Sequence, residues 1–283
     1  MLLFLGIFYY NLNGEPSSTD TNPNALNIAV VILLTKDPGV SGGFLDSITA
    51  LSVSLEEANS RHSITKVALV HEDVTHCLPV LWHFGFEVIS RAIPIRYDEI
   101  ENQQYAEGLK TDGCCGILEL LKLEVWTLSE YDYVLSMDAD MHFHQNFDYI
   151  FDAISMGNIP NAKTKIDAEY TGKYLAWTHG ATAHINQELV NGGFLVVRPN
   201  MDHYQAMYAL IKEGDFREGG KDGAAWKGSG IGWVYGGKTI QGIVPYFYFG
   251  VLGKGVADVE LDRCIFNVEC VFLFSPSLCE IDN

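Results

Sequence analysis

The strongest constraint on the fold is a continuous apolar run at residues 28–34 (IAVVILL), because it is followed by a helical pattern and then by a second apolar run. Such a run is typical of a strand buried on both faces of a parallel sheet. The next strand is expected at residues 65–70 (TKVALV). Between the two runs, helical spacing is shown by Phe44, Ile48, Leu51 and Leu55. This β-α-β order predicts an α/β fold with a mostly parallel central sheet flanked by helices.

The same patterns continue along the chain. Further strands are expected at residues 86–93, 131–137 and 193–197, and further helices at residues 117–128 and 204–211. A glycine-rich loop follows, and the residues after 239 read as extended. We therefore expect one principal domain over residues 27–267. Two flanking segments are expected: an apolar tail and linker at 1–26, and an atypical or truncated tail at 268–283.

Charge and hydropathy limit the class of ligand. The chain has 283 residues, and 18 Lys and Arg against 36 Asp and Glu give a net charge of −18. With 48% hydrophobic and 19% charged residues, it is too apolar to be disordered. An acidic chain does not hold nucleic acid by bulk charge, so we expect no nucleic-acid partner. An anionic ligand would need a local cation, of which a bound divalent ion is the simplest.

The N-terminus and the cysteines leave the compartment open. Residues 1–10 (MLLFLGIFYY) are too few for a membrane span of roughly 20 residues and lack a basic flank. They are either an N-terminal tail without a targeting role or the remnant of a signal or type II membrane anchor. Both the cytoplasm and the Golgi or endomembrane system are therefore compatible with the sequence, and so is membrane anchoring. None of the six cysteines forms C-x-x-C, and no Cys/His spacing matches a structural zinc site.

Two carboxylates follow the expected strand at residues 131–137. Asp138 and Asp140 are separated by Ala139, and they come directly after the apolar residues VLSM. A strand end places such side chains at the carboxyl edge of the sheet, where open α/β folds bind ligands. Two carboxylates at this spacing can hold a hard divalent ion that bridges to diphosphate oxygens. The competing interpretations are a solvated turn, or an aspartyl-phosphate phosphotransferase with Asp138 as nucleophile.

Residues 232–239 (GWVYGGKT) match the P-loop pattern G-x-x-x-x-G-K-[ST]. A P-loop needs a strand before it and a helix after it, so that backbone N–H groups surround the phosphates. The preceding residues KGSGI do not form a strand pattern, and the following residues contain Pro245 and look extended. We therefore interpret the match as part of a glycine-rich loop.

Two weaker signals flank the carboxylates. Asn191 and Gly192 stand in NGG before the strand FLVV, where glycines allow close backbone approach to a ligand. Lys122 lies on the helix before the Asp pair and would meet phosphate if it turned inward. Taken alone, the NGG segment is equally well explained as an ordinary turn into a strand, and the lysine as a solvent-facing residue of a helix.

In this order, the motifs resemble glycosyltransferase family 8, the glycogenin-like retaining transferases. The matching segments cover residues 27–264 and are ILLTKD, LLKLEVWTLSEYDYVLSMDADMHFHQNFDYIFD, NGGFLVVRP and TIQGIVPYFY. The resemblance implies a GT-A fold, with a Rossmann-like central sheet, and the transfer of a hexosyl group from a UDP-sugar with retention. It also implies a Mn²⁺ ion, or another divalent cation, on Asp138 and Asp140. The acceptor, a glycan, a protein or a small molecule, stays unidentified, as does the oligomeric state.

The resemblance also assigns roles to single residues. The nucleotide and its sugar would be bound by Leu34, Thr35, Lys122, Ala139, Asn191, Gly192 and Gly242. Gln241 would lie near the reacting carbon and hold geometry rather than accept a proton. Ile240 stands where the family's Asp-Gln-Gly motif has its Asp, and Asp222 in the upstream loop is the candidate to supply that carboxylate.

One departure from the family pattern bears on activity. The family's His-x-x-Gly-x-x-Lys-Pro-Trp motif, whose His completes the metal site, is missing from the printed sequence. His142 and His144 lie near the metal pair in sequence, but they read better as exposed turn residues. The rival to an active transferase is therefore a degenerate protein that binds a nucleotide-sugar without turnover.

Overall fold

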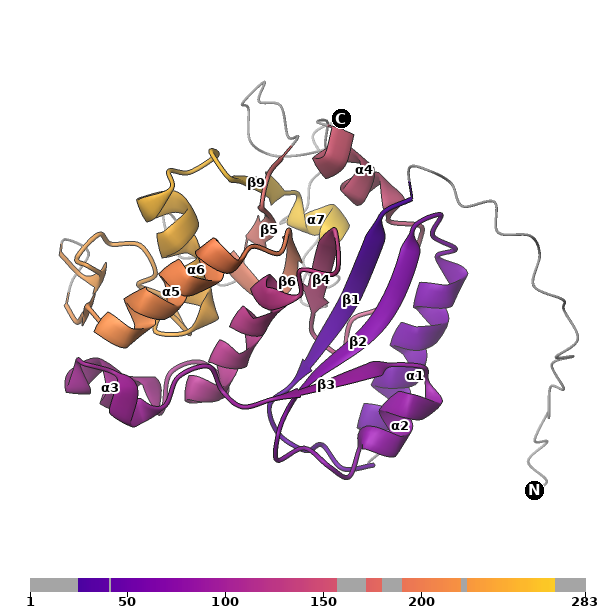
Figure 1. Ribbon diagram of the computed structural model, residues 1–283, viewed down its shortest axis with the longest axis horizontal. Coiled ribbons are helices and arrows are strands. Elements are labelled where there is room, and N and C mark those ends of the chain that lie inside the picture. Colours follow the sequence, from indigo (N-terminus) through magenta and orange to yellow (C-terminus); the bar gives the residue numbers. More distant parts are fainter. Residues whose placement is uncertain (1–24, 41, 157–171, 180–189, 220–222, 268–283) are drawn as a thin grey trace, which may run out of the picture.

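The computed structural model describes residues 25–40, 42–156, 172–179, 190–219 and 223–267 (Figure 1). Its sheet strands are β1 Asn27–Leu34, β2 Ser63–His71, β3 Glu87–Arg91, β4 Tyr133–Met137, β5 Leu175–His179, β6 Val190–Val197 and β9 Asp258–Leu261. A small separate ribbon pairs β7 Phe216–Arg217 with β8 Ala225–Trp226. The helices are α1 Gly42–Glu57, α2 Leu78–His83, α3 Gln103–Leu109, α4 Asp148–Met156, α5 Met201–Glu213, α6 Ile240–Pro245 and α7 Arg263–Phe266. Shorter or tighter helical segments are η1 Tyr97–Glu99, the 3₁₀ helix η2 Gly116–Thr127 and the π-helix η3 Tyr246–Val251.

The seven strands form one sheet in the order β3-β2-β1-β4-β6-β5-β9. Strand β1 pairs in parallel with β2 and with β4, whereas β6 is antiparallel to both of its neighbours. The chain first builds away from β1 through β2 and β3 and then returns to β4 on its other side. The reversal between β1 and β4 is a topological switch point, where open α/β sheets bind ligands beyond the strand ends.

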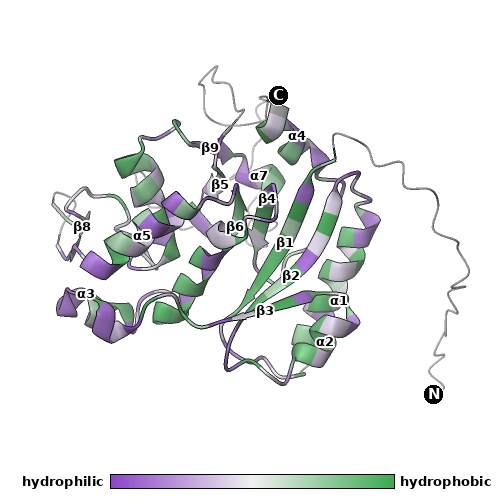
Figure 2. Cartoon of the chain, in the orientation of Figure 1, coloured by the Kyte–Doolittle hydropathy of each residue, from purple (hydrophilic) through white to green (hydrophobic). Residues whose placement is uncertain are grey.

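Each face of the sheet carries its own apolar core, and helices cover both (Figures 1 and 2). Because side chains alternate along a strand, Ala29 and Val31 of β1 pack with η2, α5 and α6, while Ile28 and Ile32 pack with α1 and α4. The predicted α/β architecture, with a mostly parallel sheet flanked by helices, is confirmed.

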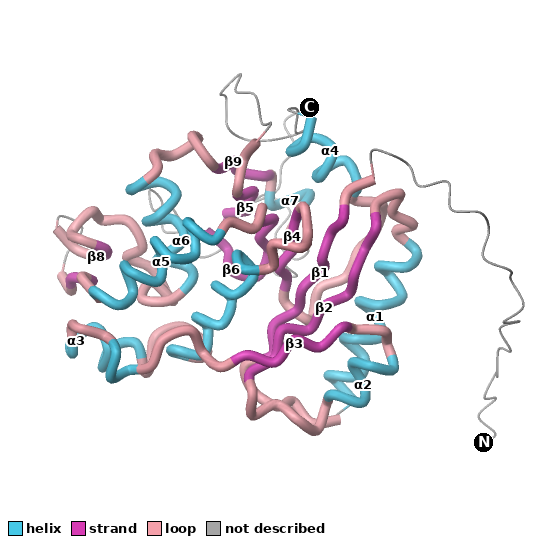
Figure 3. Tube along the Cα trace, viewed as in Figure 1, coloured by secondary structure: helices cyan, strands magenta, loops and turns pink. Residues whose placement is uncertain are grey.

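The prediction of extended structure after residue 239 is wrong. Residues 240–245 form α6 and residues 246–251 form η3, as the helical tube in Figure 3 shows. Aromatic and β-branched residues favour strands when considered alone. Here almost every residue of this segment is buried, and a helix that is apolar all round is stable only inside a core. Pro245 lacks the N–H that would continue the α-helical bonds, and the π-helix begins directly after it.

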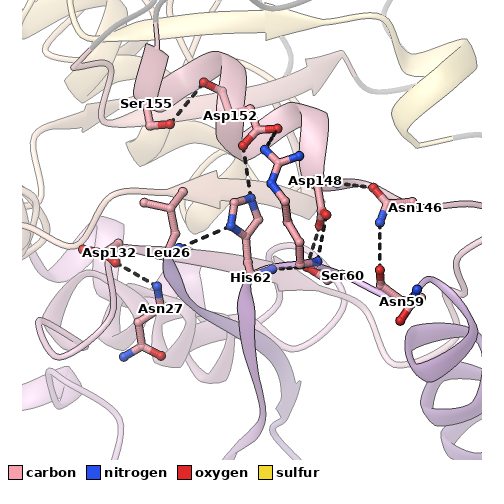
Figure 4. Close-up of polar contacts among 11 residues, drawn as sticks. Leu26, Asn27, Asn59, Ser60, His62, Asp132, Asn146, Asp148, Asp152 and Ser155 are labelled. Atoms are coloured by element: carbon pink, nitrogen blue, oxygen red, sulfur yellow. Dashed lines mark hydrogen bonds and ion pairs between the residues drawn. The ribbon is translucent and has the colours of Figure 1, made fainter. Parts of the chain in front are cut away.

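A polar network ties α4 to the amino end of β2, opposite the switch point (Figure 4). The Asp148 carboxylate accepts bonds from the Arg61 N–H (2.9 Å) and the Ser60 hydroxyl. Asp152, one turn further along α4, pairs with the Arg61 guanidinium, and the buried His62 ring points toward it. The network therefore holds the helix that follows the Asp138–Asp140 segment against the sheet.

We expect Asp148→Ala to lower the free energy of unfolding at pH 7 by about 1–3 kcal/mol, since it leaves the part-buried Ser60 hydroxyl and Arg61 N–H without their acceptor. Burial opposes ionisation of Asp148, but hydrogen bonds from Arg61 and Ser60 outweigh it and lower its pKa below 3.8. A lowered pKa stabilises the fold above the unfolded value and loses that effect as pH falls through the folded value. Urea unfolding from pH 7 to pH 3 should show the gap between wild type and variant closing, and a constant gap would contradict this.

Among the described helices, none is both long enough and apolar enough to cross a membrane. The apolar segment at residues 1–10 and the tail at 268–283 lie outside the described residues.

Candidate functional site

A hollow of about 300 Å³ opens beyond the carboxyl ends of β1 and β4, at the switch point. Strand β1 contributes Leu33 and the residue after it, Thr35, and β4 leads into Asp138. The other lining residues are Cys114, Cys115, Glu119, Lys122, Asn191, Gly192, Gly193, Tyr235, Ile240 and Gln241. Five segments far apart in the sequence thus converge on one concave surface.

Lys122 turns inward from η2 and bonds two parts of the sheet edge. Its Nζ donates to Asp138 Oδ1 (2.9 Å) and to the Gly192 carbonyl (2.6 Å). The lysine side chain is 12% exposed and the Asp138 side chain 53%. The ammonium group is therefore held at the wall of the hollow, with a carboxylate that still faces solvent.

Asn191 and Gly193 meet Asp138 because β6 is antiparallel to β4, so β6 begins where β4 ends. The Asp138 N–H donates to the Gly193 carbonyl (3.0 Å), and Asn191 Oδ1 accepts from the Gly193 N–H (2.7 Å). A Cβ at Gly193 would lie 2.5 Å from Asp138 Oδ2. Glycine at this position is thus the condition for the close approach of the carboxylate to β6.

Asp140 lies apart from Asp138 in the described structure. It lines a neighbouring hollow of about 230 Å³, together with His142 and His144. Both histidines are exposed residues of the segment before α4, as the turn interpretation predicts. Asp140 is also exposed, and it makes no hydrogen bond or ion pair with any described residue. The two carboxylates are therefore separated between adjacent hollows, and Asp140 is free of described partners.

Gln241 and Gly242 have different places at the start of α6. Gln241 lines the hollow, and its Nε2 donates to the Tyr235 carbonyl (3.2 Å). Gly242 is buried behind it, and a Cβ there would lie 1.7 Å from the Gly237 carbonyl oxygen. Gly242 thus allows α6 to pack directly on the glycine-rich loop, and it does not line the hollow as the resemblance implies.

The expectation for Leu34 also needs correction by one residue. Leu34 is 8% exposed and packs in the core beneath α1, whereas Leu33 and Thr35 line the hollow. Consecutive strand side chains point to opposite faces, so the two leucines cannot share this role. Ala139 packs against the same core as Leu34 and does not line the hollow either. Asp222 lies outside the described residues.

Residues 232–239 form turns and not a P-loop. Among the described residues, no strand leads into this segment, in agreement with the interpretation as a loop. Lys238 points away from the hollow: its Nζ pairs with Glu218 (2.9 Å) and stands over the Phe216 ring. Its backbone N–H donates to Asp112. The lysine that a P-loop would use for phosphate is thus already bound within the protein.

Several lining residues have no signal in the sequence that would single them out, above all Cys114, Cys115, Glu119 and Tyr235. Cys114, Cys115 and Glu119 stand just before the motif that begins at Leu120, and Tyr235 stands only in the rejected P-loop match. Glu119 and Lys122 share η2, and the packing of η2 against α6 brings them to Gln241. Among the described residues, the metal-ligating side chains that gather in a group of three are Cys114, Cys115 and Glu119.

No family model matches the sequence, and no curated protein sequence matches it. Similar solved structures include the glycosyltransferase GlyE of Streptococcus pneumoniae TIGR4 (13% identity, TM-score 0.48, 91% of this chain) and mouse xyloside xylosyltransferase 1 (11%, 0.48, 84% of this chain and 86% of that one). This chain spans 50% of the length of GlyE. A third is glucosyl-3-phosphoglycerate synthase from Mycobacterium tuberculosis in complex with Mn²⁺, UDP and phosphoglyceric acid (12%, 0.40, 84% and 68%). None of these similarities places a functional residue in this chain.

Proposed function

We propose that the chain is a transferase of glycosyltransferase family 8 type, which moves a hexosyl group from a UDP-sugar to an acceptor with retention at the anomeric carbon. The observation that carries the proposal is the inward-turned Lys122, held at the switch point by Asp138 and by the Gly192 carbonyl. A fixed ammonium group beside an open hollow is suited to a diphosphate, whose charge grows as it departs. The same hollow is also lined by Gln241 and Asn191, whose amides suit sugar hydroxyls.

The carboxylates fit a hard divalent cation by chemistry. Asp138 and Asp140 are exposed oxygen donors two residues apart, and Mn²⁺ prefers such ligands. A cation bound there would offset charge on the leaving diphosphate. Since Asp140 faces the neighbouring hollow, its side chain would have to turn toward Asp138 to share one ion.

Among the described lining residues the carboxylates are Asp138 and Glu119, and both are engaged within the protein, which disfavours a route through a covalent glycosyl-enzyme. Asp138 is bonded to Lys122, and both oxygens of Glu119 accept hydrogen bonds, from the Cys114 N–H and the Thr239 hydroxyl. The acceptor hydroxyl is therefore proposed to attack from the face that the diphosphate leaves. Gln241 would hold the sugar in place during this step.

The proposal is tested by UDP-sugar hydrolysis or transfer with Mn²⁺, comparing wild type with Asp138→Ala and Asp140→Ala. We expect each variant to lose roughly 10²–10³-fold in rate, as for the removal of one electrostatic contact in an active site. Asp73→Ala, on a side chain that is 89% exposed, is the matched control and should keep full activity. Unchanged turnover in either variant would remove that residue from the site, and Mn²⁺-dependent UDP binding without turnover in wild type would favour a non-catalytic binding protein.

A further inference from the structure

Two thiols and a carboxylate lie together on one wall of the hollow. Cys114, Cys115 and Glu119 each offer a ligand atom, and these atoms all lie within 4.8 Å of one another. Cys114 is exposed, while Cys115 and Glu119 are half-buried, so the group is open to an ion from solvent. Asp138 and Asp140 play no part in this cluster.

Two glycines shape the turn that presents the thiols. Gly113 and Gly116 flank the cysteine pair with φ angles of 63° and 59°, a conformation that other residues rarely adopt. A Cβ at Gly113 would lie 2.5 Å from Glu119 Oε1. The chain therefore folds tightly over the carboxylate, and this tight fold brings adjacent cysteines to the same side as Glu119.

The carboxylate of Glu119 is held in place on both sides. Its Oε1 accepts from the Cys114 N–H (2.9 Å), and its Oε2 accepts from the Thr239 hydroxyl at the start of α6. Each carboxylate oxygen keeps a further lone pair for an ion. Hydrogen-bonded support of this kind fixes the orientation of a ligand before the metal arrives.

We propose that Cys114, Cys115 and Glu119 bind one thiophilic divalent cation such as Zn²⁺, with a fourth coordination position open to the hollow. Zinc bonds sulfur at about 2.3 Å, so a tetrahedral ion sets two sulfurs roughly 3.8 Å apart. The atoms of the cluster are thus within about 1 Å of bonding separations. As each sulfur–metal bond forms, the S–H bond breaks and its proton passes to solvent.

The ligand chemistry separates this site from the proposed hard-cation site. Thiolate ligands select zinc-like ions, whereas Asp138 and Asp140 offer oxygen alone and suit Mn²⁺ or Mg²⁺. The inference therefore stands without the proposed transferase activity.

The test uses Cd²⁺ alone as the probe, added to the reduced full chain, with sulfur-to-metal absorption in the ultraviolet as the readout. Wild type should bind one Cd²⁺ per chain at this site. The double variant Cys114→Ser/Cys115→Ser should bind Cd²⁺ more than about a hundredfold more weakly, because even residues that only support a metal ligand contribute roughly 10–100-fold to metal affinity. Cys77→Ser, at a buried thiol away from the hollow, is the control and should bind as wild type does. The cysteines at 264, 270 and 279 are present in every protein compared, so their contribution cancels.

Glu119→Gln provides a second variant, since glutamine keeps an acceptor for the Cys114 N–H. It should retain the sulfur absorption and weaken Cd²⁺ binding at least about tenfold. Circular dichroism checks that each variant is folded. The three-ligand site would be overturned if wild type did not bind Cd²⁺ stoichiometrically. It would also be overturned if either the double variant or Glu119→Gln bound Cd²⁺ with wild-type affinity.

Discussion

Replacing Lys122 by methionine should reduce UDP-sugar hydrolysis or transfer by roughly 10²–10³-fold, because the hollow loses the fixed positive charge proposed to face the leaving diphosphate. Methionine preserves most of the side-chain volume but donates to neither Asp138 nor the Gly192 carbonyl. Asp138 is 53% exposed, so water can solvate it once the ion pair is gone. The free energy of unfolding should therefore fall by only about 1–2 kcal/mol.

Lys66→Met is the matched control for Lys122→Met. It removes the same charge from an ion pair with the exposed Glu56, at the surface of β2 and away from the hollow. Its turnover should equal that of wild type, since Lys66 does not line the hollow. The measurements are initial rates with Mn²⁺ and urea unfolding of all three proteins. Equal turnover in wild type and Lys122→Met would exclude Lys122 from the reaction.

Gly242→Ala should destabilise the protein by about 2–3 kcal/mol and also disturb the hollow. Alanine is favoured over glycine in a helix by up to about 1 kcal/mol, so propensity alone predicts the opposite sign. Sterics decide, because the new Cβ would lie 1.7 Å from the Gly237 carbonyl oxygen and 2.5 Å from its carbon. These are backbone atoms of a packed loop, so α6 or the loop has to move. Gln241 is the neighbouring residue and lines the hollow, so its position should change as well.

Gly43→Ala separates this steric effect from propensity. Gly43 lies in the first turn of α1, is exposed, and has no atom within 4 Å of the site of a Cβ. There the substitution should stabilise the protein by about 0.4–1 kcal/mol, because it restricts the unfolded chain. Urea unfolding measures both variants. A Gly242→Ala protein as stable as wild type would show that α6 and the glycine-rich loop are not in close contact in solution.

The local hydrophobic pattern of the sequence was sufficient to predict most strands of the sheet and most of its flanking helices. The runs at residues 28–34 and 65–70 are strands β1 and β2, and the apolar positions between them form the buried face of α1. These elements are readable because burial on both faces requires continuous apolar residues and a surface helix requires a stripe. The segment at 240–249 was not readable, since its apolar residues carry no period and its helix depends on the surrounding core.

In the hollow, too, some residues could be predicted from the sequence and others could not. Asp138 and Asn191 could be singled out because each adjoins an apolar strand, although nothing in the sequence indicates that the two meet. Their place on the same hollow depends on β6 running antiparallel beside β4. Leu33 replaces Leu34 at the hollow because one residue of register decides which face a strand side chain occupies.

The fold class, and the edge of the sheet where chemistry-bearing residues gather, could be predicted from the linear pattern, since hydrophobic period and strand ends are local properties. Cys114 and Cys115 lie beside Glu119 through a local turn at Gly113 and Gly116. The contacts of Lys122 with Asp138 and Gly192 depend instead on tertiary structure. Strand order, strand direction and close packing at glycine create these contacts between segments up to 70 residues apart. Such contacts depend on the packing of distant segments, and they cannot be predicted from the local pattern of residues along the sequence.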